Sequence, residues 1–209
     1  MAVKFDPDMF KMGYFIVYKG DNSLLARQIW LEQMEEGHNE DNARYSHVEC
    51  SGGEFDSVSV NFPKAKLIDI RKIHGGAYVK LVKFNAPDYD VKRYKVAYFS
   101  MSDIGKTYAW WSLLWWTVKD WAIFRKFLKK RLLPAGIFCS FSCAKALDAE
   151  YMLYKEPSYY MPADFLDEKY FTVVWEGEIP KYENTITRIY QRLNSWKNTI
   201  RGKTVFGMV

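Results

Sequence analysis

Residues 137–147 read IFCSFSCAKAL, and this stretch decides how the rest of the chain is interpreted. Pro134 and Gly136 end the preceding segment, and helix-forming residues follow the first cysteine. These signals place Cys139 in the first turn of a helix, where backbone N–H groups lack helical partners and the dipole is positive. A thiol in that position has a lowered pKa. Cys139 is therefore a candidate nucleophile, and the alternative is that it packs as a small buried apolar residue.

A second cysteine, Cys143, lies on the same expected helix. It is one turn after Cys139 on the same face. Because the effect of the dipole fades after the first turn, Cys143 is expected to pack in the core. The chain has 3 cysteines without the spacing of a disulfide framework, so at least one thiol is expected to be unpaired.

The composition is that of a globular protein. Of the 209 residues, 49% are hydrophobic and 26% are charged, and the formal charge of +5 favours an anionic partner. The sequence has no phosphate-cradling or base-reading motif, so nucleic acid is not an expected partner.

The longest run without charged residues, 132–144, is shorter than the roughly 20 residues of a bilayer span. The start, MAVKFDPDMF, lacks the apolar core of a signal peptide, so we expect a soluble protein made in the cytoplasm.

Short β-rich segments separated by turn signals fill the first half of the chain. Residues 12–18, MGYFIVY, are rich in aromatic and β-branched residues and precede a Lys-Gly-Asp turn. In residues 55–62 apolar and polar side chains alternate, which is typical of a strand with one buried face. We predict strands at 12–18, 45–50, 55–62, 77–84 and 170–175.

Helical spacing of apolar residues marks the segments around and after these strands. The early connections are short, which suits antiparallel pairing, so we predict an α+β fold in which an antiparallel sheet packs on helices. Residues 34–42 are expected to form a solvated loop, and residues 63–74 a connection with a short apolar element. The predicted helices begin near Asn22 or Ser23, cover 88–100, run from Cys139 to about Tyr154, and cover 183–197.

Residues 107–131 combine a broad tryptophan-rich apolar face with a basic end. We predict a helical insertion here, which is either core or a docking surface. An interfacial membrane helix is less favoured, because few basic residues lie within the apolar part. Residues 178–209 are expected to be a C-terminal helical extension of the main domain, 1–177. Self-association or contact with other protein subunits is predicted through the insertion or the extension.

Cysteine catalysis requires a base, a group that orients the base, and donors for the oxyanion. Histidine is the usual base, and the chain has 3 of them. His38 lies in an acidic loop, and His74 precedes two glycines at a turn. His47 lies within the predicted strand 45–50, which fixes its direction. The alternative is that His47 is a core or edge residue of the sheet.

The segment ARYSHVEC, residues 43–50, resembles the histidine strand of the permuted papain-like cysteine hydrolases. These are relatives of the NlpC-type cell-wall amidases and endopeptidases, in the YiiX-like and lecithin–retinol acyltransferase-like branch. The resemblance covers residues 13–175, and other segments match in the order of the family. They are MGYFIVYKGDNSLLARQIW at 12–30, GAYVKLVKF at 76–84, GKTYAWW at 105–111, IFCS at 137–140 and YMPADF at 160–165.

The resemblance implies a circularly permuted papain-like fold with an aromatic-rich helical insertion. By position it makes His47 the general base and Cys139 the nucleophile, with the backbone N–H of Cys139 binding the oxyanion. Ser140, Tyr45 and Tyr108 are implied as further oxyanion or substrate contacts. The reaction it implies is hydrolysis or transfer at an amide, ester or thioester carbonyl through an acyl-enzyme.

The group that orients His47 has three candidates. The family often places a glutamate or another polar residue on the strand after the histidine strand, and here that strand offers Ser59 and Asn61. Glu49 is two residues from His47 on one strand and projects to the same face, so it could serve instead. The sequence also has Phe141 where the family commonly has an acid.

A metal site would need a different grouping of the same residues. His47 and Cys50 together with Cys139 and Cys143 would supply four zinc ligands. A strand sends His47 and Cys50 to opposite faces, so no metal or cofactor is expected.

These inferences together predict a cysteine hydrolase that cleaves an amide bond, with cell-wall peptide as the expected substrate. Since no signal peptide is expected, the predicted setting is a phage virion that carries the enzyme to the wall. The alternative is a catalytically impaired structural or assembly subunit of a virion, which uses the same fold for protein–protein contacts.

Overall fold

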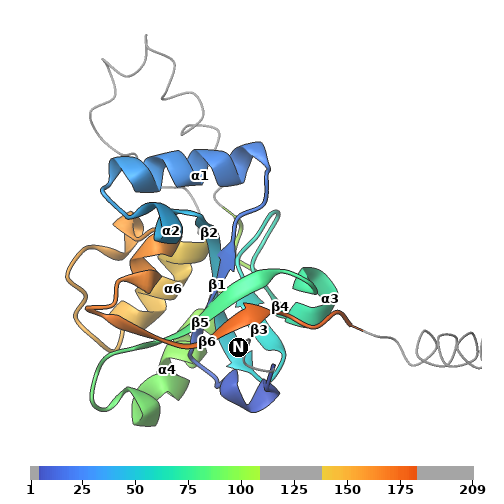
Figure 1. Cartoon of the computed structure of the whole chain (residues 1–209). Helices are drawn as coiled ribbons and strands as arrows, with labels where there is room; N and C mark the ends of the chain where they lie inside the picture. Colours follow the sequence, from blue (N-terminus) through green and yellow to red (C-terminus); the bar gives the residue numbers. More distant parts are fainter. Residues whose placement is uncertain (1–4, 109–137, 183–209) are drawn as a thin grey trace, which may run out of the picture.

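The computed structural model of this chain describes residues 5–108 and 138–182. Its centre is a six-stranded antiparallel sheet in the order β4-β3-β2-β1-β5-β6 (Figure 1). This confirms the predicted α+β class with an antiparallel sheet. The strands are β1 (Phe15–Lys19), β2 (Tyr45–Gly53), β3 (Asp56–Ser59), β4 (Lys66–Asp69), β5 (Tyr78–Phe84) and β6 (Phe171–Glu178).

Helices flank the sheet and begin at residues suited to capping. The side chains of Ser23, Asn39 and Asp69 each accept a hydrogen bond from a backbone N–H in the first turn of the helix that follows. The α-helices are α1 (Leu24–Glu35), α2 (Glu40–Ala43), α3 (Ile70–His74), α4 (Tyr89–Met101) and α6 (Cys139–Asp148). Three short 3₁₀ helices are η1 (Pro7–Met9), η2 (Pro157–Tyr159) and η3 (Pro162–Leu166).

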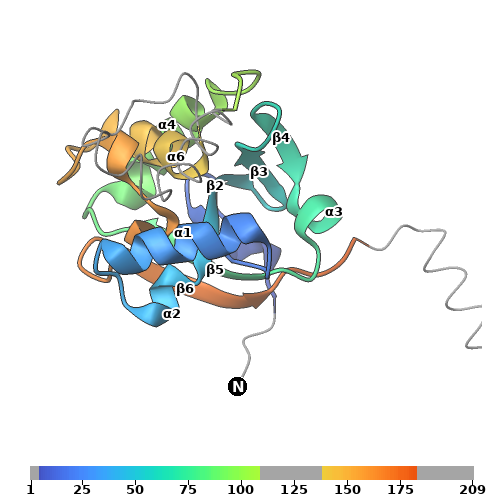
Figure 2. The ribbon, with the colours of Figure 1, turned by 90° about the horizontal axis from the view of Figure 1, so that it is seen from above.

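The helices that position the candidate site lie at two places around the sheet. Helices α4 and α6 lie side by side and both contact β2 (Figures 1 and 2). Helix α3 lies beside β4 at the opposite end of the sheet from α4 and α6 in both views. Strand β2 therefore runs between a helix that carries Cys139 and a helix that ends at His74.

Strand β1 forms the middle of the core. Residues 15–18 are all buried, so both faces of the sheet are covered along this strand. Apolar side chains of β5 and α6 complete the cluster around it. Each large apolar side chain that is fully buried stabilises the fold by about 1.5–3 kcal/mol. The fully buried members include Phe15, Ile16, Val17, Val79, Leu81, Ala144, Leu147 and Phe165.

Four sequence predictions differ from the structure. The segment 63–74 contains a strand, β4, and a helix, α3, and the predicted loop 34–42 contains α2. Strand β3 ends at Ser59, so Asn61 lies beyond it. Helix α6 ends at Asp148 and does not reach Tyr154, because the Asp148 carboxylate accepts a hydrogen bond from the Leu153 backbone N–H (3.2 Å) and turns the chain.

Two of the predicted elements fall mainly on residues that the structure does not describe. They are the helical insertion at 107–131 and the helical extension at 178–209. Among the described helices, none has the length and apolar character needed to cross a membrane.

Candidate active site

Cys139 is the first residue of helix α6. The residue before it, Phe138, has extended backbone and provides no side-chain cap, so the first turn keeps N–H groups for other acceptors. The thiol accepts hydrogen bonds from the backbone N–H groups of Val48 and Ser140. The residue is buried, with 7% of its surface exposed. The predicted position at a helix start thus brings the Ser140 N–H to the sulfur, and β2 supplies the Val48 N–H.

His47 connects the thiol to a carboxylate. Its Nε2 lies 3.0 Å from Oε1 of Glu49, and its imidazole is hydrogen-bonded to the thiol of Cys139. Because Nε2 is hydrogen-bonded to Glu49, Nδ1 is the ring nitrogen that remains for the hydrogen bond with the Cys139 sulfur. The strand geometry explains the first contact, because residues two apart on β2 project to one face. The second contact depends on the packing of α6 against β2.

Cys139 and His47 shift each other's protonation. Burial alone disfavours the charged form of either group. For Cys139, the positive charge of His47 and the hydrogen bonds to the sulfur outweigh burial and lower the pKa of the thiol. For His47, burial is outweighed by the negative charge of Cys139 and by Glu49, and the pKa of the imidazole is raised to about 10. Both shifts favour the form of the pair in which Cys139 is a thiolate and His47 an imidazolium.

Glu49 has no exposed side-chain surface and accepts four hydrogen bonds. Oε2 accepts from the hydroxyls of Tyr18 (2.8 Å) and Ser57 (2.5 Å). Oε1 accepts from Nε2 of His47 (3.0 Å) and Nε2 of His74 (3.1 Å). Burial alone would raise the pKa of this carboxyl, but the two imidazoles outweigh it and hold the pKa well below its usual range. Four donors fill the acceptor positions of a carboxylate, so its orientation is fixed.

The four donors to Glu49 determine the tautomer of His47. An ionised carboxylate can only accept, so both histidines carry hydrogen on Nε2. When His47 is neutral, its lone pair is therefore on Nδ1, the atom that faces Cys139. This is the tautomer that a general base for the thiol requires.

The other two candidates for orienting His47 lie elsewhere. Asn61 is exposed, and its Oδ1 accepts from the backbone N–H of Phe62 (3.1 Å). Ser59 is buried at the end of β3, in register with Lys66 of β4. The hydrogen bonds described for the imidazole of His47 go to Glu49 and Cys139, so Glu49 is the group that occupies the orienting position.

Of the three residues expected to contact the oxyanion or the substrate, two lie near the Cys139 thiol and one does not. Tyr108 is close enough for the charge of Cys139 to add to burial in raising the pKa of its hydroxyl. Ser140 offers its backbone N–H to the sulfur, while its hydroxyl donates to the carbonyl of Tyr160 (2.6 Å). Tyr45 faces the other end of the sheet, where Nζ of Lys80 lies 5.0 Å from its ring centroid. Tyr108 and Ser140 therefore adjoin the thiol, and Tyr45 does not.

Sequence reasoning missed three residues of the site: Tyr18, Ser57 and His74. Tyr18 is opposite His47 in the β1–β2 register, and Ser57 comes from β3. His74 ends helix α3 and was interpreted as a turn residue because two glycines follow it. A register prediction for β1 and β2 could have found Tyr18, but no local pattern marks the other two.

The remaining cysteines are part of the core. Burial raises the pKa of Cys50 to about 12 and raises that of Cys143 well above its ordinary value. The sulfur of Cys143 lies 3.9 Å from the carbonyl oxygen of Val48. The four-ligand zinc set considered from the sequence is therefore not assembled. Among the residues that the structure describes, His47, Glu49 and His74 form the one group of three or more potential metal ligands.

The buried carboxylate of Asp103 holds helix α6, which carries Cys139, in place. The side chain of Asp103 has no exposed surface and accepts from the hydroxyl of Ser142 (2.6 Å) and from Lys106 (2.6 Å). It also pairs with Lys145 of the same helix. Burial opposes ionisation of Asp103, but the two ammonium groups and the hydroxyl outweigh it and lower the pKa. These bonds connect α6 to the segment that follows α4.

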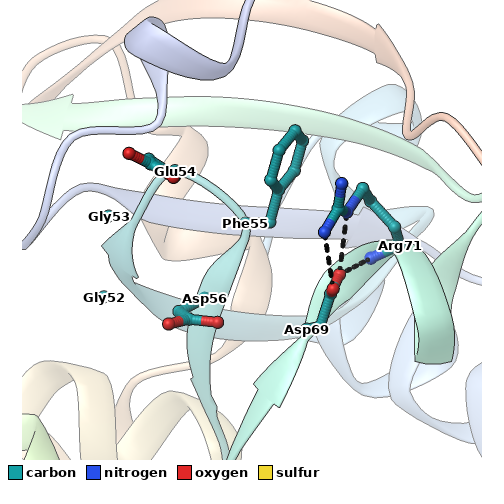
Figure 3. Close-up of a pocket in the computed structure, with 7 residues that line it drawn as sticks. All are labelled: Gly52, Gly53, Glu54, Phe55, Asp56, Asp69 and Arg71. Carbon is teal, nitrogen blue, oxygen red and sulfur yellow. Dashed lines mark hydrogen bonds and ion pairs between the residues drawn. The ribbon is translucent and has the colours of Figure 1, made fainter. Parts of the chain in front are cut away.

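A hollow of about 390 Å³ lies at the β2–β3 turn and is separate from this site (Figure 3). Arg71 stacks on Phe55, with its guanidinium carbon 3.6 Å from the ring centroid, and is paired with Asp69 (2.7 Å). The lining residues include neither histidine nor cysteine. This hollow therefore lacks a thiol and an imidazole, and Cys139 with His47 and Glu49 remains the candidate active site.

Comparisons with protein-family models, curated proteins and solved structures found no match for this chain.

Proposed function

We propose that this chain is a cysteine hydrolase of the permuted papain-like type, which cleaves an amide bond through an acyl-enzyme. The observation that carries the proposal is the linear arrangement of Cys139, His47 and Glu49. A thiol at a helix start is hydrogen-bonded to an imidazole, and that imidazole is hydrogen-bonded through its other nitrogen to a buried carboxylate. Nucleophile, base and orienting group in this order define the cysteine triads of papain-like enzymes.

The chemistry follows from these contacts. The Cys139 sulfur attacks the carbonyl carbon, an S–C bond forms, and the carbonyl π electrons move to the oxygen. Backbone N–H groups at the start of α6 stabilise the oxyanion. When the tetrahedral intermediate collapses, the C–N bond breaks and the leaving amine takes the proton from Nδ1 of His47. A water then attacks the thioester and gives its proton to Nδ1, and the acid is released with the thiolate restored.

For substrate and setting we propose cell-wall peptide and a phage virion. The resemblance of the six sequence segments to relatives of the NlpC-type cell-wall amidases and endopeptidases supports the substrate. The formal charge of +5 is compatible with an anionic wall polymer. The virion setting is proposed from the resemblance, because members of this branch occur in phages.

The second candidate is a structural subunit that uses the fold for protein–protein contacts. One observation favours it: helix α4 exposes an apolar stripe, with Val91 73%, Tyr94 56% and Tyr98 71% exposed. These residues are at helical spacing and share one face, which is typical of a contact surface. The proposed contacts of the insertion 107–131 and the extension 178–209 would add to this surface.

The deciding experiment measures release of soluble amino groups from purified peptidoglycan sacculi. The wild-type chain should release peptides, and Cys139→Ser should not. Cys50→Ser is the matched control, because Cys50 is a buried core thiol away from His47, and its activity should stay within about two-fold of wild type. If Cys139→Ser releases as much as wild type, the hydrolase proposal fails. If no variant cleaves sacculi, a scan of peptide amides, esters and thioesters separates a different substrate from the structural alternative.

A further inference from the structure

We propose that His47, Glu49 and His74 bind a divalent transition-metal ion, of which Zn²⁺ is the reference, and that binding closes the Cys139 site. The binding itself does not depend on the proposed hydrolase activity. The effect on Cys139 does rest on that proposed function.

The first argument is geometric. Nε2 of His47, Nε2 of His74 and a carboxylate oxygen of Glu49 all lie within 4.8 Å of one another. The two nitrogens are 3.0 and 3.1 Å from Oε1. Tetrahedral zinc with bonds of about 2.0–2.1 Å places its ligand atoms about 3.3 Å apart. The two nitrogen–oxygen distances therefore need to lengthen by only a few tenths of an ångström to admit the ion.

The second argument is the chemistry of the donor set. Two imidazole nitrogens and one carboxylate oxygen suit Zn²⁺, Co²⁺, Ni²⁺, Cu²⁺ and Fe²⁺, whereas Mg²⁺ and Ca²⁺ prefer oxygen ligands alone. Three protein ligands also leave coordination positions open for water.

The third argument is the support around the ligands. The other oxygen of Glu49, Oε2, is held by the hydroxyls of Tyr18 and Ser57. Oε1 can therefore exchange its two N–H donors for a metal ion while the hydrogen bonds to Oε2 keep the carboxylate in its orientation. Hydrogen bonds of this kind to a ligating carboxylate are typical of metal sites, and their loss weakens metal affinity by roughly 10–100-fold.

The fourth argument is charge and access. Glu49 is fully buried, and within 5–108 and 138–182 no lysine or arginine forms an ion pair with it. A dication would take the place of the proton that gives His47 its positive charge beside this buried carboxylate. The ion can enter from the histidine side, because the side chains of His47 and His74 are 19% and 18% exposed.

The consequence for the active site follows from which nitrogen is used. A metal binds Nε2 of His47 only after the proton on that nitrogen has left to solvent, so the N–H hydrogen bond to Glu49 is lost. The ring then turns toward the metal and away from the position in which Nδ1 meets Cys139. The metal-bound form and the hydrolytic form therefore exclude each other. Cys139 lies on the opposite side of the imidazole and is not among the three ligands.

The test uses the full chain with Cys139→Ser, stripped with EDTA and dialysed free of it. Equilibrium dialysis with Zn²⁺ should give one ion per chain, and Mg²⁺ should not compete. In this background, His74→Gln and Glu49→Gln should each weaken binding at least ten-fold, and Ser57→Ala should weaken it by a smaller factor. His38→Gln is the matched control, because its ring lies beside Asp164 (3.5 Å) and not in this cluster. Its affinity should equal that of the background.

Co²⁺ gives a second readout that does not depend on activity. The visible absorption of Co²⁺ should appear in Cys139→Ser and in wild type, without a sulfur-to-cobalt charge-transfer band. Loss of binding in Cys139→Ser, or a sulfur band in wild type, would assign the ion to the Cys139–His47 pair and overturn the proposal. Equal binding by His74→Gln and His38→Gln would overturn it as well. Thermal melts of each variant separate lost binding from lost folding, and Ser57→Ala leaves all three ligands in place.

Activity then separates the two proposals. If wild type cleaves sacculi, Zn²⁺ should stop cleavage and EDTA should restore it. If wild type binds Zn²⁺ through the three residues but cleaves nothing under any condition, the hydrolase proposal fails and the metal site stands. If Zn²⁺ binds and cleavage continues at saturation, the closure of the Cys139 site is wrong.

Discussion

His47 and Glu49 project from the same face of β2, and Nε2 of the histidine lies 3.0 Å from Oε1 of the glutamate. The orienting group of the proposed triad is thus on the same strand as the base. Their backbone positions are fixed relative to each other by β2. A triad built in this way needs only one tertiary contact, between α6 and β2, to place the nucleophile.

Glu49→Gln should abolish most of the activity while the chain stays folded. The amide loses the charge that stabilises the imidazolium and can present an N–H to the Nε2–H of His47. By analogy with carboxylate-to-amide changes in serine triads, we expect kcat to fall roughly 10²–10⁴-fold with a smaller change in KM. Steady-state kinetics on the identified substrate check this. Asn61→Ala should leave kcat within about two-fold, and equal losses in the two variants would contradict the assignment.

Cys139 should be alkylated before the other two cysteines. Its pKa is lowered by His47, whereas burial raises the pKa of Cys50 to about 12 and that of Cys143 well above normal. A short iodoacetamide pulse at neutral pH followed by peptide mapping should find the label on Cys139. The variant His47→Gln should slow that labelling. Labelling of Cys143 first would exclude the thiolate assignment.

The pH dependence of alkylation follows from the two opposite shifts. The folded pKa of Cys139 is depressed, so its thiolate should persist below about pH 8.5, the ordinary thiol pKa, and disappear as pH falls through the folded value. The pKa of His47 is raised to about 10, so the imidazolium partner should be lost as pH rises through that value. The rate of alkylation should therefore reach half of its plateau at a lower pH than that of a free thiol. A midpoint at or above about pH 8.5, the ordinary thiol value, would refute the ion pair.

Asp103→Asn should destabilise the fold. The buried carboxylate binds Ser142 and two ammonium groups, and those ammonium groups are partly exposed, so we expect a loss of about 1–2 kcal/mol in the free energy of unfolding. The folded pKa of Asp103 is depressed, so its contribution is present above about pH 3.9 and is lost as pH falls through the folded value. Urea titrations at pH 7 and near pH 3 measure the difference, which should shrink at the lower pH.

The control for this variant is Asp88→Asn. Asp88 pairs with Lys92 on the exposed surface of α4, where an ion pair contributes little to stability. Its urea midpoint should match that of wild type. If both aspartate variants unfold at the same urea concentration, Asp103 does not fix α6 as inferred.

Parts of the site could be predicted from the sequence because the signals are local. The breakers before Cys139 predicted the start of α6, and alternation along a strand predicted that His47 and Glu49 share a face. Asn61 was a candidate because alternation continues to residue 62. The strand ends earlier, at Ser59, and proline at 63 has no N–H with which to continue a ladder.

The remainder could not be predicted because it depends on pairing between distant segments. Tyr18 reaches Glu49 only in the observed register of β1 and β2, in which Tyr18 is opposite His47. His74 reaches the same carboxylate because α3 ends there, 25 residues along the chain. Nothing in the sequence near either residue differs from an ordinary strand tyrosine or a turn histidine.

The donors to Glu49 come from β1, β2, β3 and α3, and all of these segments precede Cys139 in the chain. During synthesis the four hydrogen bonds to Glu49 can therefore form before Cys139 is added to the chain. Until α6 docks on β2, Cys139 has no imidazole partner and only the reactivity of an ordinary cysteine. The reactive form of the sulfur thus arises only once α6 has docked on β2, so the speed of its alkylation would report that docking step.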